Sequence, residues 1–240
     1  MLNRISDFTS ANDHQIHTSA HPEKSVSDEN HVTKKQGVAN SCGAASLLCA
    51  AIELGVNKMP VFKGSLSDIT GNDALELNNI CESDLYQLTC SNHNPLTHSS
   101  DISQAGYSMP ENIVTAARIC GLNTHVVEDN IFFSKALSFI YPHVKEVLNG
   151  IGCEIRHADI PLNLNQRKLE AVAVSFAGIP VGLHWVLCRP DGSYMDPGTG
   201  KNSPDFAGAE IEMKQYNSKF CGYYKTGISV ILTSPEKMPA

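Results

Sequence analysis

Residues 40–55 read NSCGAASLLCAAIELG. Almost every position after Cys42 in this stretch is apolar, and the run ends at Gly55, a residue type that often terminates helices. The stretch therefore predicts a buried central helix. Asn40 and Ser41 belong to the residue types that cap helices by accepting a hydrogen bond from first-turn N–H groups. We therefore expect Cys42 at the N-terminus of this helix.

The position of Cys42 suits a nucleophile. A cysteine reacts as the thiolate, and its pKa of about 8.5 falls at a helix N-terminus beside an imidazolium. Gln36 lies six residues upstream, where its side-chain amide could join the backbone N–H groups in an oxyanion hole. Cys49, two helical turns further along the apolar helix, is expected to be an inert buried thiol.

A general base and its orienting acid come from a predicted hairpin. Residues 181–188 alternate as a strand with His184 on one face, and Pro, Asp and Gly at 190–192 suit a three-residue loop with a bulge. In that register Asp196 pairs with Val186 and lies on the face of His184, one diagonal step away. A two-residue loop would place the two side chains on opposite faces. The sequence therefore predicts a Cys42, His184 and Asp196 triad.

Composition excludes several classes of protein. The 240 residues are 42% hydrophobic and 18% charged, as in a soluble globular protein. The net charge of −7, without a basic run, disfavours electrostatic binding to nucleic acid or to an anionic membrane surface. The apolar stretch 171–188 is interrupted by Gly, Pro and His, so we expect two strands and no stable membrane insertion. Eight cysteines without a C-x2-C pair predict free thiols.

The chain divides into three parts. Residues 1–35 are polar and without periodicity, which predicts a disordered arm that could carry a secretion signal. Residues 36–234 are expected to form one catalytic domain, and 235–240 a loose end. Helical patterns occur at 74–90, 111–120 and 132–148, and strand patterns at 170–176, 181–188, 193–196 and 227–234.

Two other functions stay open. The same triad could deamidate glutamine or transfer an amide, because both reactions also pass through a thioester. A zinc-binding module could use Cys81, Cys90, His93 and His98, although the spacing C-x8-C-x2-H-x4-H matches no compact zinc site well. A mechanism that uses the Cys42, His184 and Asp196 triad requires no cofactor.

Three segments carry a family resemblance. NSCGAASLLCAA at 40–51, AGYSMP at 105–110 and GLHWVLCRPDGSYMDP at 182–197 resemble the corresponding segments of the IpaJ-type effectors, type III secreted cysteine proteases of enteric pathogens. The wider Gln-x5-Cys-Gly, His and Asp-Pro pattern is similar to the papain-like peptidases that process double-glycine bacteriocin leaders. The resemblance implies an α+β fold with a papain-like core, in which a central N-terminal catalytic helix packs on an antiparallel sheet.

The resemblance also implies a substrate. It implies irreversible cleavage after the N-myristoylated glycine of host ARF-family GTPases, which would release them from membranes and disturb Golgi traffic. Cys42 would be the nucleophile, His184 the base and Asp196 the orienting acid. Gln36 as oxyanion donor rests on the papain-like spacing. The protein would lie in the bacterial cytoplasm before type III export, and would then act in the host cytoplasm at the Golgi.

Overall fold

The computed structural model describes residues 31–59, 73–95, 106–129, 140–158 and 160–235. The helices are α1 (Cys42–Glu53), α2 (Asn79–Thr89), α3 (Pro110–Ile119), α5 (Val144–Gly150) and α6 (Phe206–Tyr216). The strands are β1 (Lys58–Met59), β2 (Asp73–Ala74), β3 (Asn123–Glu128), β4 (Ile155–Arg156), β5 (Gln166–Phe176), β6 (Ile179–Cys188), β7 (Tyr194–Asp196), β8 (Lys201–Ser203) and β9 (Cys221–Thr233).

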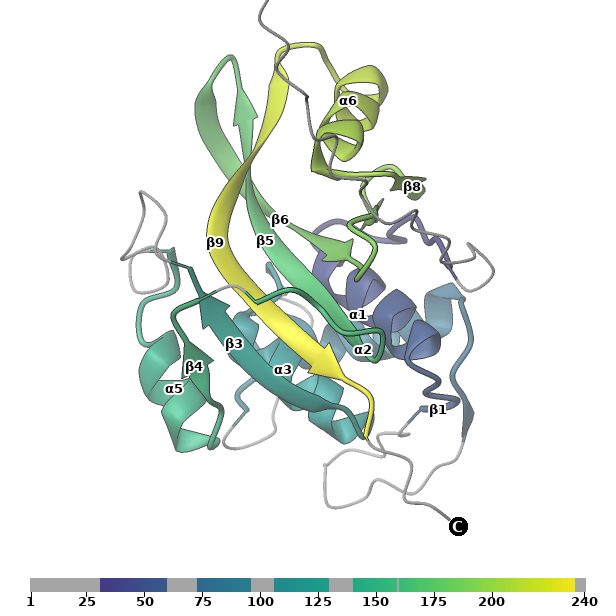
Figure 1. Ribbon diagram of the computed structural model, residues 1–240, viewed down its shortest axis with the longest axis vertical. Helices are drawn as coiled ribbons and strands as arrows, with labels where there is room; N and C mark the ends of the chain where they lie inside the picture. Colours follow the sequence, from purple (N-terminus) through teal and green to yellow (C-terminus); the bar gives the residue numbers. More distant parts are fainter. Residues whose placement is uncertain (1–30, 60–72, 96–105, 130–139, 159, 236–240) are drawn as a thin grey trace, which may run out of the picture.

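One large sheet organises the chain, with the strand order β4-β3-β9-β5-β6-β7-β8. The β3–β4 pair is parallel, and the other neighbouring strands are antiparallel. Helices α1, α2 and α3 gather on one side of the sheet, and α6 lies over its far end (Figure 1). The α+β class is therefore as expected, with a mainly antiparallel sheet behind the central helix.

Strand β6 separates two apolar clusters. Trp185 and Leu187 lie in the main core, together with the residues of α1. Val186 and Cys188 point to the other face, into a smaller cluster that contains the apolar side chains of α6. This confirms the predicted alternation, because successive side chains of a strand face opposite sides of the sheet.

Helix α1 is the buried central helix that the sequence predicts. All residues from Cys42 to Ala51 are buried. The expected side-chain cap is wrong, because Ser41 makes no capping hydrogen bond. Its hydroxyl donates instead to the carbonyl of Val38 at 2.8 Å and to the carboxylate of Glu82 at 2.6 Å. The reason is tertiary, since the hydroxyl turns towards the buried carboxylate of Glu82 and away from the first-turn N–H groups from which a cap would accept.

The hairpin after β6 has the predicted three-residue loop. Cys188 pairs with Tyr194, and the N–H of Arg189 donates to the carbonyl of Ser193 at 3.0 Å. Gly192 closes the loop with φ 88°, a left-handed conformation that glycine adopts without steric cost. The loop length therefore brings β7 back beside β6 in the register that the sequence predicts.

A buried group of charges orients α1 against the sheet. Glu53, in the last turn of α1, accepts from Arg167 of β5 at 2.6 Å and from Arg189 of the hairpin at 2.8 Å. It also accepts from the N–H of Val32 at 3.1 Å. The side chains of Glu53 and Arg189 are fully buried, so loss of Glu53 would leave the charge of Arg189 uncompensated in the interior. These bonds connect the helix that begins at Cys42 to the hairpin that carries His184.

Several elements differ from the sequence patterns. Helix α2 begins at Asn79, well inside the predicted range 74–90, because Asn78 caps it by accepting from the N–H of Cys81. Of the range 132–148, residues 132–139 lie outside the described part, and α5 covers its end. Strands β3, β4 and β8 and helix α6 were not predicted. Strands β4 and β8 have only two and three residues, and α6 has a weak apolar face.

The structure describes only part of the two terminal segments that the sequence predicts. Residues 1–30 and 236–240 lie outside the described residues, so the domain division stays a prediction. Residues 31–35, assigned to the arm from the sequence, pack against the fold, and Lys34 is buried. All eight cysteines are free thiols, as predicted. None of the helices in the described part combines the length and apolar character that crossing a bilayer requires.

Candidate active site

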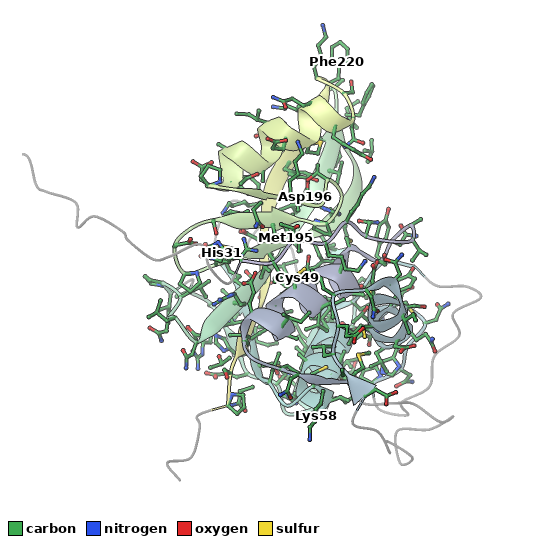
Figure 2. The ribbon with its side chains drawn as sticks, turned by 90° about the vertical axis from the view of Figure 1, so that its right-hand side faces the viewer. His31, Cys49, Lys58, Met195, Asp196 and Phe220 are labelled. Atoms are coloured by element: carbon green, nitrogen blue, oxygen red, sulfur yellow. The ribbon has the colours of Figure 1, made fainter. Side chains whose placement is uncertain are left out.

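His184 of β6 and Asp196 of β7 form a hydrogen-bonded pair. His184 Nε2 lies 2.7 Å from Asp196 Oδ1, and both side chains are buried. The hairpin produces this contact, because its three-residue loop places both side chains on one face of the sheet. Figure 2 shows Asp196 midway along the molecule, between Phe220 at one end and Lys58 at the other.

The carboxylate of Asp196 is held by three donors. Oδ1 accepts from the backbone N–H of Gly198 at 2.7 Å as well as from His184, and Oδ2 accepts from the hydroxyl of Tyr223 at 3.0 Å. Burial opposes ionisation, but the hydrogen bonds, above all that from His184, outweigh burial and lower the pKa of Asp196. Asp196 is therefore an ionised, fixed partner for the imidazole.

Tyr223 is a site residue that the sequence did not reveal. It lies on β9, and its ring stacks on that of His184 with centroids 5.7 Å apart and planes at 18°. With its hydroxyl on Asp196, it supports both members of the pair. No local signal could have found it, because β9 reaches the site only through sheet pairing with β5.

Cys42 faces the imidazole from the first residue of α1. A side-chain hydrogen bond and the charge of Cys42 both act on His184. Burial by itself lowers the pKa of His184, but Cys42 and Asp196 outweigh burial and raise it to about 10. Because Nε2 is bonded to Asp196, Nδ1 is the ring nitrogen available to Cys42. The arrangement therefore favours an imidazolium facing the side chain of Cys42.

The residue after Cys42 must be small. A Cβ atom on Gly43 would lie 2.4 Å from Cβ of Ser108 and 3.3 Å from Cδ1 of Trp185. Ser108 belongs to the AGYSMP segment, and its carbonyl accepts from the indole Nε1 of Trp185 at 3.0 Å. This close packing anchors the N-terminus of α1 against the strand that carries His184.

The backbone of Gln36 is hydrogen-bonded to the chain next to Asp196. Its N–H donates to the carbonyl of Pro197 at 2.8 Å, next to Asp196 in the chain. Its side-chain amide donates to the carbonyl of Val38 at 3.0 Å, within its own loop. The structure thus brings the main chain of Gln36 to the triad, and its part in an oxyanion hole stays a prediction.

A buried carboxylate on α2 holds the loop before Cys42. Glu82 Oε1 accepts from the N–H of Gly37 at 2.8 Å and from the hydroxyl of Ser41 at 2.6 Å. Glu82 Oε2 forms an ion pair with Lys34 Nζ at 2.5 Å. Sequence reasoning missed Glu82 because a glutamate on a helix of mixed polarity is usually exposed.

Two other buried thiols, Cys49 and Cys120, have a raised pKa. Burial, followed by the charge of Glu53, raises the pKa of Cys49 to about 12, and burial raises that of Cys120 to about 12. These thiols are protonated and inert at neutral pH, as predicted for Cys49. Across the described ranges, no group of three or more His, Cys, Asp and Glu side chains could hold a metal ion, and His98 of the zinc alternative lies outside those ranges.

Comparisons with known proteins agree on one family. Residues 34–235 match the family model described as Invasion plasmid antigen J, cysteine protease. The chain is 56% identical over 203 residues to the protein named Cysteine protease IpaJ of Shigella flexneri, covering 85% of this chain and 78% of that protein. No solved structure matches the chain. The matched region contains Gln36, Cys42, His184, Asp196 and Tyr223.

Proposed function

Because this chain belongs to the IpaJ family of cysteine proteases, we propose that it cleaves the peptide bond after the N-myristoylated glycine of ARF-family GTPases. The observation that carries the proposal is the buried His184–Asp196 pair beside Cys42 at the start of α1. The likeness of segments 40–51 and 182–197 to the IpaJ-type effectors supports the substrate.

The first half of the reaction forms a thioester. The Cys42 thiolate attacks the carbonyl carbon of the lipidated glycine, and negative charge develops on the carbonyl oxygen. Backbone N–H groups at the N-terminus of α1 stabilise that charge, with Gln36 as a further donor. The His184 imidazolium then gives its proton to the departing amine as the peptide bond breaks.

The second half releases the lipid. His184, now neutral, takes a proton from water, and the resulting hydroxide attacks the thioester carbonyl. The C–S bond breaks, so that myristoylglycine leaves and Cys42 is a thiolate again beside the imidazolium. Asp196 keeps the ring oriented through both halves and stabilises its charged form.

The biological setting follows from the substrate. Cleavage would remove the lipid anchor of the GTPase irreversibly, release it from membranes and disturb host Golgi traffic. The protein would reach the host cytoplasm by type III secretion from the bacterial cytoplasm.

The test is the intact mass of a myristoylated ARF-family GTPase after incubation with the protein. The wild type should remove one myristoylglycine unit and Cys42→Ala should remove none. Cys49→Ala, which changes a buried thiol on the same helix, should keep full activity because that thiol is inert.

Three results would contradict the proposal. An unchanged GTPase mass, with a thiol-directed probe showing reactive Cys42, would mean a different substrate. The small mass gain that accompanies conversion of an amide to an acid would favour glutamine deamidation instead. Cleavage by Cys42→Ala would remove Cys42 as the nucleophile.

A further inference from the structure

The far end of the sheet exposes large apolar side chains. Phe176 at the end of β5, Ile179 at the start of β6 and Phe220 just before β9 are 50%, 67% and 56% exposed. Figure 2 shows Phe220 at the extreme end of the molecule, away from the helices that pack on the main core. Together with the exposed Val181 and Tyr224, these residues are called the apolar tip.

The apolar tip is one continuous surface. Phe176 pairs with Ile179 across the hairpin, and the rings of Phe176 and Phe220 meet edge to face with centroids 6.1 Å apart. Tyr224 follows Tyr223, whose side chain points towards His184, so Tyr224 faces the opposite side of the sheet. The tip therefore presents apolar groups on both faces of a projecting sheet end.

Few charged residues lie in the strands that form the tip. Residues 171–188 contain no Asp, Glu, Lys or Arg. Residues 213–234 contain Lys214, Lys219 and Lys225 and no acidic residue, in a chain whose net charge is −7. The ammonium of Lys219 lies 5.3 Å from the ring centroid of Phe220. Lys214 pairs with Glu210 at 2.6 Å and Lys225 with Glu170 at 3.3 Å, so the cation at the tip itself is the exposed Lys219.

We propose that the apolar tip docks into the interfacial region of an anionic lipid bilayer. Exposed aromatic and aliphatic side chains beside a lysine suit the headgroup layer, where apolar groups are buried and a cation meets anionic lipid. Lys219 beside Phe220 and the two-faced apolar surface favour lipid over a protein partner, which would cover one face.

Docking would also place the catalytic groups close to the membrane. His184 lies on β6, five residues beyond Ile179, which corresponds to about 17 Å along a strand. The active site would face the zone in which lipid-anchored proteins reside. The docking itself is independent of the substrate proposed above.

The experiment is cosedimentation with vesicles, using the Cys42→Ala protein so that turnover plays no part. Binding to phosphatidylcholine vesicles containing phosphatidylserine should exceed binding to phosphatidylcholine alone. The triple change Phe176→Ser, Ile179→Ser, Phe220→Ser should lower the partition coefficient about tenfold or more, since three partly exposed apolar side chains are lost. Lys219→Glu should lower binding to the anionic vesicles alone.

A matched control distinguishes docking through the tip from non-specific hydrophobic adsorption to the vesicles. Ile80→Ser, Ile160→Ser, Leu164→Ser removes three side chains that are 73%, 58% and 75% exposed elsewhere on the surface, and it should bind like the parent. Circular dichroism of each variant reports whether it folds, and Lys219→Glu keeps the test decisive if the triple variant does not.

Three results would overturn the proposal: no binding of the parent to either vesicle, equal loss in the tip and control variants, or a dimer in solution that the tip variant dissociates. The last result would assign the tip to a second copy of the chain. Cleavage of a water-soluble myristoylated peptide by the wild type tests the proposed function separately, because it needs no membrane.

Discussion

Replacing Glu82 by Gln should destabilise the protein and disturb the site together. Glu82 is buried on α2, its side chain is 2% exposed, and its ion partner Lys34 is 7% exposed. Glutamine has the same shape but no charge. If its oxygen accepts from Gly37 and Ser41, its NH2 group must face the ammonium of Lys34, donor against donor.

The size of the effect follows from burial. Breaking a buried ion pair by removing one partner costs about 3–5 kcal/mol, because the other charge stays in the interior. Lys34 keeps two acceptors, Asn79 Oδ1 at 2.7 Å and the carbonyl of Lys35 at 3.2 Å. We therefore expect a loss near the lower limit, about 3 kcal/mol in the free energy of unfolding.

Urea unfolding of a double-mutant cycle measures this loss. Lys34→Met alone should also destabilise, since it leaves the Glu82 carboxylate without its cation. The double variant Lys34→Met, Glu82→Gln should recover to within about 1.5 kcal/mol of the wild type, because no uncompensated buried charge remains. Turnover should fall in Glu82→Gln, because the loop that leads to Cys42 loses its anchor.

A surface pair provides the control. Glu212 pairs with Lys201 on the surface, and Glu212→Gln should change stability by about 1 kcal/mol or less. The reasoning fails if Glu82→Gln costs no more than this control, or if the double variant is as unstable as the sum of the two single ones.

Three further predictions concern the triad. Asp196→Asn should leave Cys42 open to thiol labelling but slow turnover by about two to four orders of magnitude, because His184 loses its orienting charge; an unchanged rate would mean that another group orients the ring. Tyr223→Phe should cost about 1.5–3 kcal/mol in urea unfolding, since a buried carboxylate oxygen loses its donor; a loss near zero would show that the hydroxyl does not donate in solution. The pKa of His184 is raised from 6.5 to about 10, so the stabilisation from its proton is complete below pH 6.5 and is lost as the pH rises towards 10. Cys42→Ala should flatten that decline and lower the imidazole pKa seen by NMR, because Cys42 is the largest contributor that raises it, and an unchanged pKa would contradict the assigned contact.

Local sequence was sufficient for the central elements. The residues after Cys42 are apolar on every face of α1, so the helix is stable only when the fold buries it on all sides. Pro190 and Gly192 set the loop length, and the loop length sets which face of the sheet Asp196 shares with His184. The contact between base and acid was predictable because both lie within one hairpin.

Residues that support the site from a distance were not predictable in the same way. Glu82 and Tyr223 reach the loop before Cys42 and the carboxylate of Asp196 from α2 and β9. Ser41 was expected to cap α1, yet its hydroxyl turns to Glu82. Each of these contacts joins residues far apart in the chain and depends on which elements pack together.

The sequence by itself determined the helix that carries Cys42, the hairpin that pairs His184 with Asp196, and the family to which they point, because periodicity, turn chemistry and short motifs are local properties. Only the tertiary structure decided how these two pieces meet. The packing of Gly43 against Ser108 and the buried bonds of Glu53 join α1 to the hairpin, and they arise from burial and hydrogen-bond satisfaction over the whole fold. The exposed apolar tip is likewise a tertiary property, because what a strand end buries depends on which elements cover it.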